Sequence, residues 1–407
     1  MTEISGGVCA AKGFLASGIR CGIKPSSQKK DLALIFSNSP CSAAAVFTSN
    51  KVKAASVLVT KENIVNGKIR AVIANSGNAN ACTGDEGMDS AKRMVKLAAD
   101  ALQIDSGEIA VASTGVIGVP LPIGVIENGI GSLKNSLRDD DQGNADALEA
   151  IMTTDTRKKE IAVEIEIAGK KVRIGAIVKG SGMIHPNMAT MLGFITTDAA
   201  IQSDALDAAL RAAVKKSFNR LTVDGDMSTN DMVLIMANGE AGNAPLVNNE
   251  NGFKVFYEAL EYICVALTRT MARDGEGAGK LVTVTVSGAE SEENAEILAK
   301  SVASSSLVKT ACFGADANWG RVLCAMGYSG ADFKLEKTSV SFKSSAGIIQ
   351  VCKDGMTFPF SEDLAKKILS EEEIEIIITL GEGGPKASVW GCDLTYDYVK
   401  INGDYRS

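Results

Sequence analysis

The sequence predicts a mixed α/β or α+β fold with much antiparallel strand pairing, and three observations support this. Strand-like runs bounded by turn residues recur along the chain, and several alternate apolar and polar residues at period two. Amphipathic helical stretches lie between these runs. The chain has 407 residues, 45% of them hydrophobic and 22% charged, which is a globular composition too long for one ordinary core. Two or three domains are therefore expected.

The expected strands are short apolar runs that end at Gly, Ser or Asn. They are "LALIFS" (32–37), "IRAVIANSG" (69–77), "EIAVAS" (108–113), "IAVEIEIAG" (161–169), "VRIGAIVKG" (172–180), "DMVLIMANG" (231–239), "LVTVTVSG" (281–288) and "EIEIIITLG" (373–381). The alternation in several of them predicts sheets with one covered face.

Three stretches have the spacing of helices. Residues 85–102 place apolar side chains on one stripe, and residues 203–218 open with a Ser-Asp capping signal. Residues 253–272 are apolar nearly all round and predict a buried helix. A soft boundary is expected near residue 280, after the glycine-rich "RDGEGAGK", which divides the chain into domains 1–280 and 281–407.

Composition excludes several classes of function. The net charge is −7 without a basic block, which disfavours nucleic-acid binding. No apolar run approaches the roughly 18 residues that span a bilayer, so no membrane partner is expected. Nine cysteines without a CxxC and a single histidine offer no metal site of ordinary ligand spacing. Reduced, mostly buried thiols in a cytoplasmic protein are expected.

The segment "HPNMATMLGF" (185–194) places Thr190 in a tight apolar run. A threonine hydroxyl is a weak nucleophile without a base, and His185 is the only imidazole of the chain. Cleavage before Thr190 would supply another base, because the new α-amino group has an ordinary pKa of about 7.7 to 8.0. The residue would then carry its nucleophile and its base together.

Motifs along almost the whole chain resemble those of the ornithine acetyltransferase (glutamate N-acetyltransferase) family of arginine biosynthesis. They are "GFLASGIRCGIK" (13–24), "NSGNANACTG" (75–84), "ASTGVIGVPLP" (112–122), "MTTDT" (152–156), "KGSGMIHPNMATML" (179–192) with "GFITTDA" (193–199), "VDGDMSTND" (223–231), "RDGEGAGK" (273–280), "DANWGRVLCAMGYSG" (316–330) and "YVKINGDYRS" (398–407). The resemblance implies a layered α-β-β-α core of largely antiparallel sheets with a smaller C-terminal α/β domain, whose tail returns to the active site.

The resemblance also implies a set of site residues. Self-cleavage falls between Ala189 and Thr190 and gives an α chain of 1–189 and a β chain of 190–407. Thr190 is the nucleophile and also contacts substrate. Thr114 and Gly115 form the oxyanion hole. The other substrate contacts are Thr153, Lys179, Glu276, Asn402 and Ser407. Thr154 rivals Thr153, and the family often ends in threonine where this chain has Ser407.

The implied activity moves an acetyl group from N2-acetylornithine to glutamate through an acetyl-threonine intermediate. No cofactor is expected, because the threonine ester carries the group. Whether acetyl-CoA also serves as donor, which would make the enzyme bifunctional, stays open. The implied assembly is an α2β2 heterotetramer in the cytoplasm.

Two of these motifs also suit other interpretations. "STGVIG" (113–118) also suits an ordinary turn, with Asn75 and Asn78 holding it as second-layer groups. "DGDMSTND" (224–231) echoes a calcium loop but has Thr229 and Ile235 where that loop needs glycine and glutamate. A related self-cleaving aminopeptidase or amidohydrolase is the rival enzyme, and a non-catalytic scaffold is the rival of another class.

Overall fold

The computed structural model describes residues 1–185, 191–248, 250–381 and 383–404. The chain forms two compact units. Unit 1 comprises Met1–Gly180, Asn187–Asn219 and Met227–Leu267, and unit 2 comprises Ser181–Pro186, Arg220–Asp226 and Thr268–Ser407. The boundary expected near residue 280, and the α and β chains on either side of the junction at 189/190, stay predictions.

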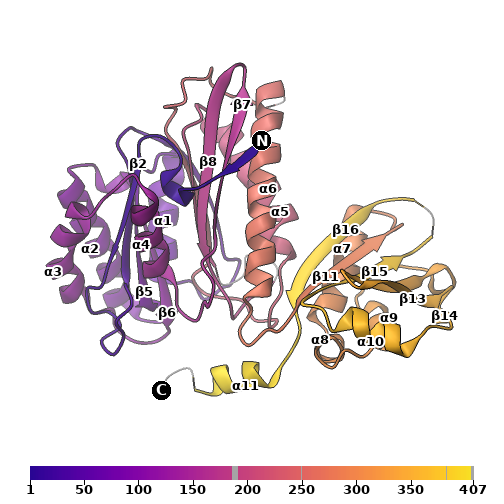
Figure 1. Ribbon diagram of the computed structural model, residues 1–407. Helices are drawn as coiled ribbons and strands as arrows, with labels where there is room; N and C mark the ends of the chain where they lie inside the picture. The colour runs from indigo at the N-terminus through magenta and orange to yellow at the C-terminus, as the bar shows by residue number, and fades with distance from the viewer. Residues whose placement is uncertain (186–190, 249, 382, 405–407) are drawn as a thin grey trace. The chain divides into compact units, whose positions relative to one another are not determined.

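Unit 1 contains two sheets (Figure 1). The six-stranded sheet has the order β1 (Thr2–Ile4), β7 (Glu160–Ile167), β8 (Lys170–Lys179), β9 (Leu192–Thr197), β10 (Met232–Ala237) and β4 (Ser42–Phe47). The four-stranded sheet has the order β2 (Phe14–Ile19), β3 (Leu32–Ser37), β5 (Ala71–Asn78) and β6 (Ile109–Val116). Among the described strands of unit 1, only the pairs β9–β10 and β5–β6 are parallel, so antiparallel pairing dominates as predicted.

Alternating side chains stack the two sheets of unit 1 face to face. One hydrophobic cluster joins Phe194 and Leu234 of the six-stranded sheet to Ile35 and Val72 of the four-stranded sheet. The helix α4 (Asp141–Ile151) contributes to the same cluster, and the Asp140 side chain caps it by accepting from the Gly143 N–H. The facing sides of the sheets thus form one core.

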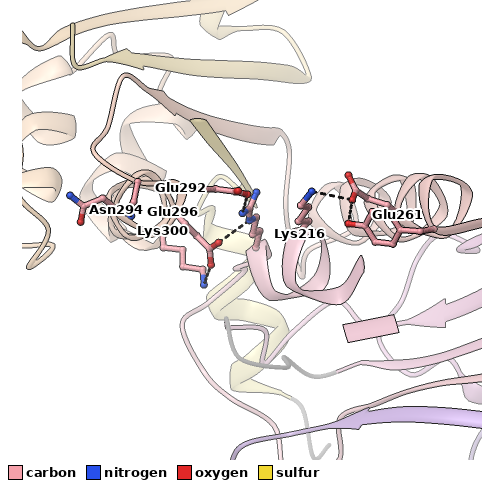
Figure 2. A network of polar contacts seen from close by, with 9 residues as sticks. Lys216, Glu261, Glu292, Asn294, Glu296 and Lys300 are labelled. Atoms are coloured by element: carbon pink, nitrogen blue, oxygen red, sulfur yellow. Dashed lines mark hydrogen bonds and ion pairs between the residues drawn. The ribbon is translucent and has the colours of Figure 1, made fainter. Parts of the chain in front are cut away.

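Helices cover the outer sides of both sheets. A second cluster packs the other face of the four-stranded sheet against α1 (Ala55–Asn63), α2 (Gly84–Leu102) and α3 (Ile123–Asn135). On the six-stranded sheet α5 (Ser203–Lys216) packs against β4, and an ion pair between Lys216 and Glu261 joins α5 to α6 (Asn251–Arg273) (Figure 2). The predicted α-β-β-α layering is confirmed.

Unit 2 is a smaller α/β structure built on one six-stranded sheet. Its order is β14 (Met356–Thr357), β13 (Gly347–Lys353), β12 (Ser339–Ser344), β15 (Glu373–Thr379), β11 (Leu281–Ser287) and β16 (Lys386–Cys392). Its helices are α7 (Glu292–Ser304), α8 (Ser306–Phe313), α9 (Trp319–Gly327), α10 (Glu362–Leu369) and α11 (Tyr396–Gly403). Ile374, Ile376 and Ile378 enter its core, as the period-two pattern predicts.

A buried arginine fastens the segment Arg220–Asp226 to the rest of unit 2. The Arg220 guanidinium lies 2.9 Å from Glu296 and 2.6 Å from Glu292, two carboxylates of α7. Lys300 of the same helix lies 2.6 Å from Glu296 (Figure 2). Planar guanidinium groups suit such paired carboxylate contacts.

Two helix predictions need correction. The prediction that residues 253–272 form a buried helix is wrong for one face of α6, where Val255 and Tyr262 are each 39% exposed beside Lys254 and Glu258. The helix α5 begins at Ser203, but its N-cap is Gln202, which makes no side-chain capping bond.

All nine cysteines are free thiols, and six of them are buried. Burial raises the pKa of Cys264 and Cys312 to about 12, so these thiols stay protonated near neutral pH. Within the described ranges, no helix combines the length and the apolar character needed to cross a membrane.

Candidate active site

In unit 1 the predicted oxyanion residues lie where β6 ends beside β5. Thr114 is opposite Ser76, and Gly115 is opposite Gly77. A Cβ on Gly115 would stand 2.3 Å from the Gly77 carbonyl carbon, and the residue has φ +135°. Only glycine permits this approach of two backbones, so position 115 is fixed by geometry. The turn is therefore tightly specified.

Lys179 meets Thr114 inside unit 1. It is the last residue of β8, it is 3% exposed, and its Nζ lies 3.4 Å from the Thr114 Oγ1. A buried ammonium beside a hydroxyl presents positive charge and hydrogen-bond donors together. Such an arrangement suits an anionic group, such as a carboxylate or a developing oxyanion. Two residues predicted from separate motifs are thus brought together.

Asp155 organises the segment that carries Thr153. Its Oδ2 accepts from the Thr153 N–H at 3.0 Å, and its Oδ1 accepts from the Gly180 N–H at 2.7 Å. Burial alone would raise the pKa of Asp155, but Lys179 and Lys159 outweigh it and hold that pKa below its ordinary value. The carboxylate is therefore charged, and it links the 153 turn to the residue that follows Lys179.

Thr153 and Thr154 both lie in the bend between α4 and β7 and are partly buried. The carbonyl of Met152 accepts a hydrogen bond from the Lys24 ammonium at 3.0 Å. The side chain of Lys24 also occupies the space beside Gly77, since a Cβ there would lie 2.5 Å from Lys24 Cγ. Lys24 thus holds the segment that carries both threonines close to the end of β5.

The polar groups around the turn that carries Thr114 and Gly115 include the two asparagines predicted to support it. Asn75 donates to the Asn78 carbonyl at 2.9 Å, and Asn78 donates to the carbonyls of Val119 and Pro120 at 3.0 and 3.1 Å. These bonds hold the loop that follows β6 close to the end of β5. Both side chains act on backbone and so stabilise the turn.

In unit 2 Glu276 and Asn402 contact each other. The Asn402 Nδ2 donates to Glu276 Oε2 at 2.8 Å, although the two residues are far apart in sequence. The Glu276 N–H donates to the Ser181 carbonyl at 2.8 Å. A Cβ on Gly182 would stand 2.3 Å from the Glu276 carboxylate, so glycine leaves room for the acid. A buried carboxylate of this kind suits a cationic group.

The segment resembling a calcium loop binds backbone instead. Asp224 accepts from the N–H groups of Met183 at 2.6 Å and Ile184 at 2.8 Å, within unit 2. The ring of His185 lies 3.4 Å from the Thr222 hydroxyl, and burial lowers the pKa of His185. Both side chains thus act locally in this turn. In the described part of the chain, no cluster of His, Cys, Asp and Glu could hold a metal ion.

Three predicted residues, Ala189, Thr190 and Ser407, lie outside the described residues. Three other residues were missed as functional candidates: Asp155, Asn230 and Asp231. Each falls inside a motif quoted above, but spacing alone does not show that its side chain binds the backbone of a distant segment. Buried polar residues in a loop are the signal, and burial cannot be seen in the sequence of a loop.

Comparison with known proteins identifies the family. The ArgJ family model matches residues 15–407. The "Arginine biosynthesis bifunctional protein ArgJ" of Caldanaerobacter subterraneus subsp. tengcongensis is 50% identical over 407 residues, and the alignment covers 100% of both chains. The "Glutamate N-acetyltransferase" of Methanothermobacter thermautotrophicus is 49% identical in an alignment over 407 residues that covers 99% of this chain and 98% of that protein.

A crystal structure of the arginine biosynthesis bifunctional protein argJ from Bacillus halodurans is 45% identical, with a TM-score of 0.49, over 52% of this chain and 97% of the other. The resemblance drawn from the motifs is confirmed by the family model and the full-length relatives. The chain is an enzyme that belongs to the ArgJ family.

Proposed function

We propose that this enzyme is a glutamate N-acetyltransferase that takes its acetyl group from N2-acetylornithine. It first cuts itself between Ala189 and Thr190 and then carries the acetyl group on Thr190. The observation that carries the proposal is the contact of Lys179 with Thr114 in unit 1. A carboxylate-binding cation next to an oxyanion donor is what acyl transfer from an N-acetylated amino acid requires.

Self-cleavage prepares the base. The Thr190 hydroxyl attacks the Ala189 carbonyl carbon, and the acyl group moves from nitrogen to oxygen. Water then hydrolyses this ester, which frees the Ala189 carboxylate and leaves Thr190 with a hydroxyl and an α-amine. The amine serves as proton acceptor because its ordinary pKa, about 7.7 to 8.0, lies near neutrality.

Acetyl transfer follows in two halves. The Thr190 oxygen attacks the acetyl carbonyl while its proton passes to the α-amine. The Thr114 hydroxyl and the Gly115 N–H stabilise the oxyanion. The C–N bond breaks, the α-amine protonates the leaving nitrogen, and ornithine departs. The amine of glutamate then attacks the ester, its proton returns to the Thr190 oxygen by way of the α-amine, and N-acetylglutamate leaves.

The charges of the predicted site residues match this pair of substrates. Lys179 binds the carboxylate that both amino acids share, and Thr153 or Thr154 contributes hydrogen bonds. Glu276 binds the distal ammonium of ornithine, with Asn402 and Ser407 beside it in the proposal. No cofactor is needed, because the threonine ester holds the acetyl group. Acetyl-CoA would enter as an alternative donor in a bifunctional enzyme. Two α and two β chains would assemble in the cytoplasm.

The test begins with the purified protein on a denaturing gel and by mass spectrometry. Two pieces are expected, the second beginning at Thr190. Incubation with N2-acetylornithine should leave one acetyl group on that piece, and added glutamate should remove it as N-acetylglutamate. A parallel reaction with acetyl-CoA tests the second donor. Thr190→Ala should stay uncut and inactive, and Thr190→Ser should cleave slowly. Hydrolysis of peptide amides without transfer to glutamate would favour an aminopeptidase instead.

A further inference from the structure

Four consecutive polar residues, Ser228 to Asp231, are buried immediately before β10 in unit 1. Such burial is costly unless each side chain is hydrogen-bonded. The run includes no glycine or apolar residue that would fill space more cheaply. The hydrogen-bond partners of Asn230 and Asp231, the last two residues of the run, show what these side chains hold in place.

Asn230 holds the oxyanion strand. Its Nδ2 donates to the Ser113 carbonyl at 2.7 Å and to the Ala79 carbonyl at 2.6 Å. The Ser113 carbonyl belongs to the same planar peptide group as the Thr114 N–H. Any rotation of that peptide would move Thr114, so the Asn230 amide fixes the orientation of the residue that begins the oxyanion turn.

Asp231 holds the strand that begins after Thr190. Its Oδ1 accepts from the Met191 N–H at 2.9 Å, and the whole residue is 0% exposed. Met191 is the first described residue after Thr190 in the sequence, so this bond anchors the described backbone next to the proposed nucleophile. Backbone pairing continues the contact, since the Met232 N–H donates to the Met191 carbonyl at 3.1 Å. Burial raises the pKa of Asp231 well above its ordinary value, so the carboxyl is easily neutralised.

We propose that Asn230 and Asp231 form a positioning pair that sets the spacing between Thr114 and Met191, the residue that follows the proposed nucleophile in the sequence. The Cα atoms of consecutive residues stand about 3.8 Å apart across a rigid peptide. The two anchors therefore cannot shift independently. The pair would serve self-cleavage and acetyl transfer alike, because both reactions use the Thr190 hydroxyl oxygen and the same oxyanion site. This inference rests on the proposed function.

The test compares variants by kcat, KM, cleavage rate and thermal midpoint. Asn230→Ala removes both amide donors and should lower kcat about 100-fold, in line with the cost of a misplacement near 1 Å. KM should change less than about threefold, since the substrate contacts remain. Asn230→Ser keeps one donor, so its kcat should lie between those of the wild type and Asn230→Ala. It replaces Asn230→Ala if that variant does not fold.

Asn243→Ala is the matched control. Asn243 is also buried in unit 1, and its Nδ2 donates to the carbonyls of Ala200 at 3.0 Å and Ala244 at 2.7 Å, beyond the far end of β9. It should lower the thermal midpoint as Asn230→Ala does but leave kcat within about twofold. Equal kcat in the two variants would overturn the role of Asn230.

The conservative change at position 231 separates positioning from proton transfer. Asp231→Asn keeps an oxygen acceptor for the Met191 N–H and should retain cleavage and most of kcat, whereas Asp231→Ala should lose both. If Asp231→Asn is as inactive as Asp231→Ala, the positioning role is overturned. An uncut, inactive wild type would contradict the proposed function and this inference with it. A cut, active wild type alongside a fully active Asn230→Ala contradicts the inference alone.

Discussion

Asp155 and Lys159 form an ion pair in which neither side chain has any exposed surface, with Nζ 2.6 Å from Oδ1. The same carboxylate oxygen accepts from the Gly180 N–H, so the pair also holds the end of β8. Charges buried at this depth are tolerated only when partners compensate them. The stability of unit 1 and the geometry around Lys179 therefore depend on one carboxylate.

Removing one partner should cost far more here than at the surface. Lys159→Met leaves Asp155 with less compensation, and we expect the free energy of unfolding to fall by about 3 to 5 kcal/mol. Urea unfolding followed by circular dichroism measures it. Lys96→Met is the matched control, because Lys96 pairs with Asp100 on an exposed helix face and should cost about 0.5 kcal/mol or less. Equal losses in both variants would contradict the importance of the buried pair.

The Thr114 hydroxyl should act on catalysis without acting on binding. Thr114→Val keeps the shape of the buried side chain but removes the donor, and we expect kcat to fall about 100- to 1000-fold, or about 2.7 to 4 kcal/mol. Thr114→Ser restores the hydroxyl and should recover most of the rate. Steady-state assays with acetylornithine and glutamate provide the comparison, and a Thr114→Val enzyme with normal kcat would remove Thr114 from the oxyanion site.

Much of the fold could be predicted because its signals are local. Ile374 and Ile376 alternate with Glu373 and Glu375, and this period already assigns the strand and its buried face. The exposed face of α6 was missed because Val255 and Tyr262 are apolar yet lie on the side that carries Lys254 and Glu258. Composition does not decide which stripe a long helix buries; the elements that pack against the helix do.

The site was only partly predictable for a related reason. Thr114 and Lys179 lie in motifs that resemble a known family, so they could be named from sequence. The contacts of Asp155 with Gly180 and of Asn230 with Ser113 join segments distant in the chain through side chain and backbone. Every residue type has a backbone N–H and carbonyl. No sequence pattern marks the partner in such a bond.

Glu276 should act on the binding of acetylornithine and leave self-cleavage unchanged. Glu276→Gln removes the charge that the ornithine ammonium would meet, and a hydrogen bond to a charged group contributes about 1.5 to 3 kcal/mol. We expect KM for acetylornithine to rise about tenfold or more, while KM for acetyl-CoA, if it is a donor, and the extent of self-cleavage stay near wild type. Glu373→Gln, at an exposed carboxylate paired with Arg269, is the control. Equal damage to cleavage and to ornithine binding would contradict the assigned role.

Lys24 should make stability depend on pH in the alkaline range. Burial lowers the pKa of Lys24 from 10.5 to about 8; Asp31 opposes this shift, and Lys29 and Lys179 add to it. Between pH 8 and 10.5 the unfolded chain still binds a proton that the folded chain has released. Lys24 therefore adds a positive slope to the pH dependence of the unfolding free energy in this window. Below pH 8 both states are protonated, and the folded state carries the full cost of the buried charge.

Lys24→Met should remove that slope. The variant also loses the hydrogen bond to the Met152 carbonyl, but this loss shifts the whole curve without bending it. The quantity to compare is thus the change in unfolding free energy from pH 7 to 10.5, measured by urea titration at each pH. Lys51→Met, at an exposed lysine, should reproduce the wild-type slope. If the Lys24→Met and Lys51→Met curves run parallel, Lys24 is not the group that titrates, and its ammonium is better solvated than its contacts imply.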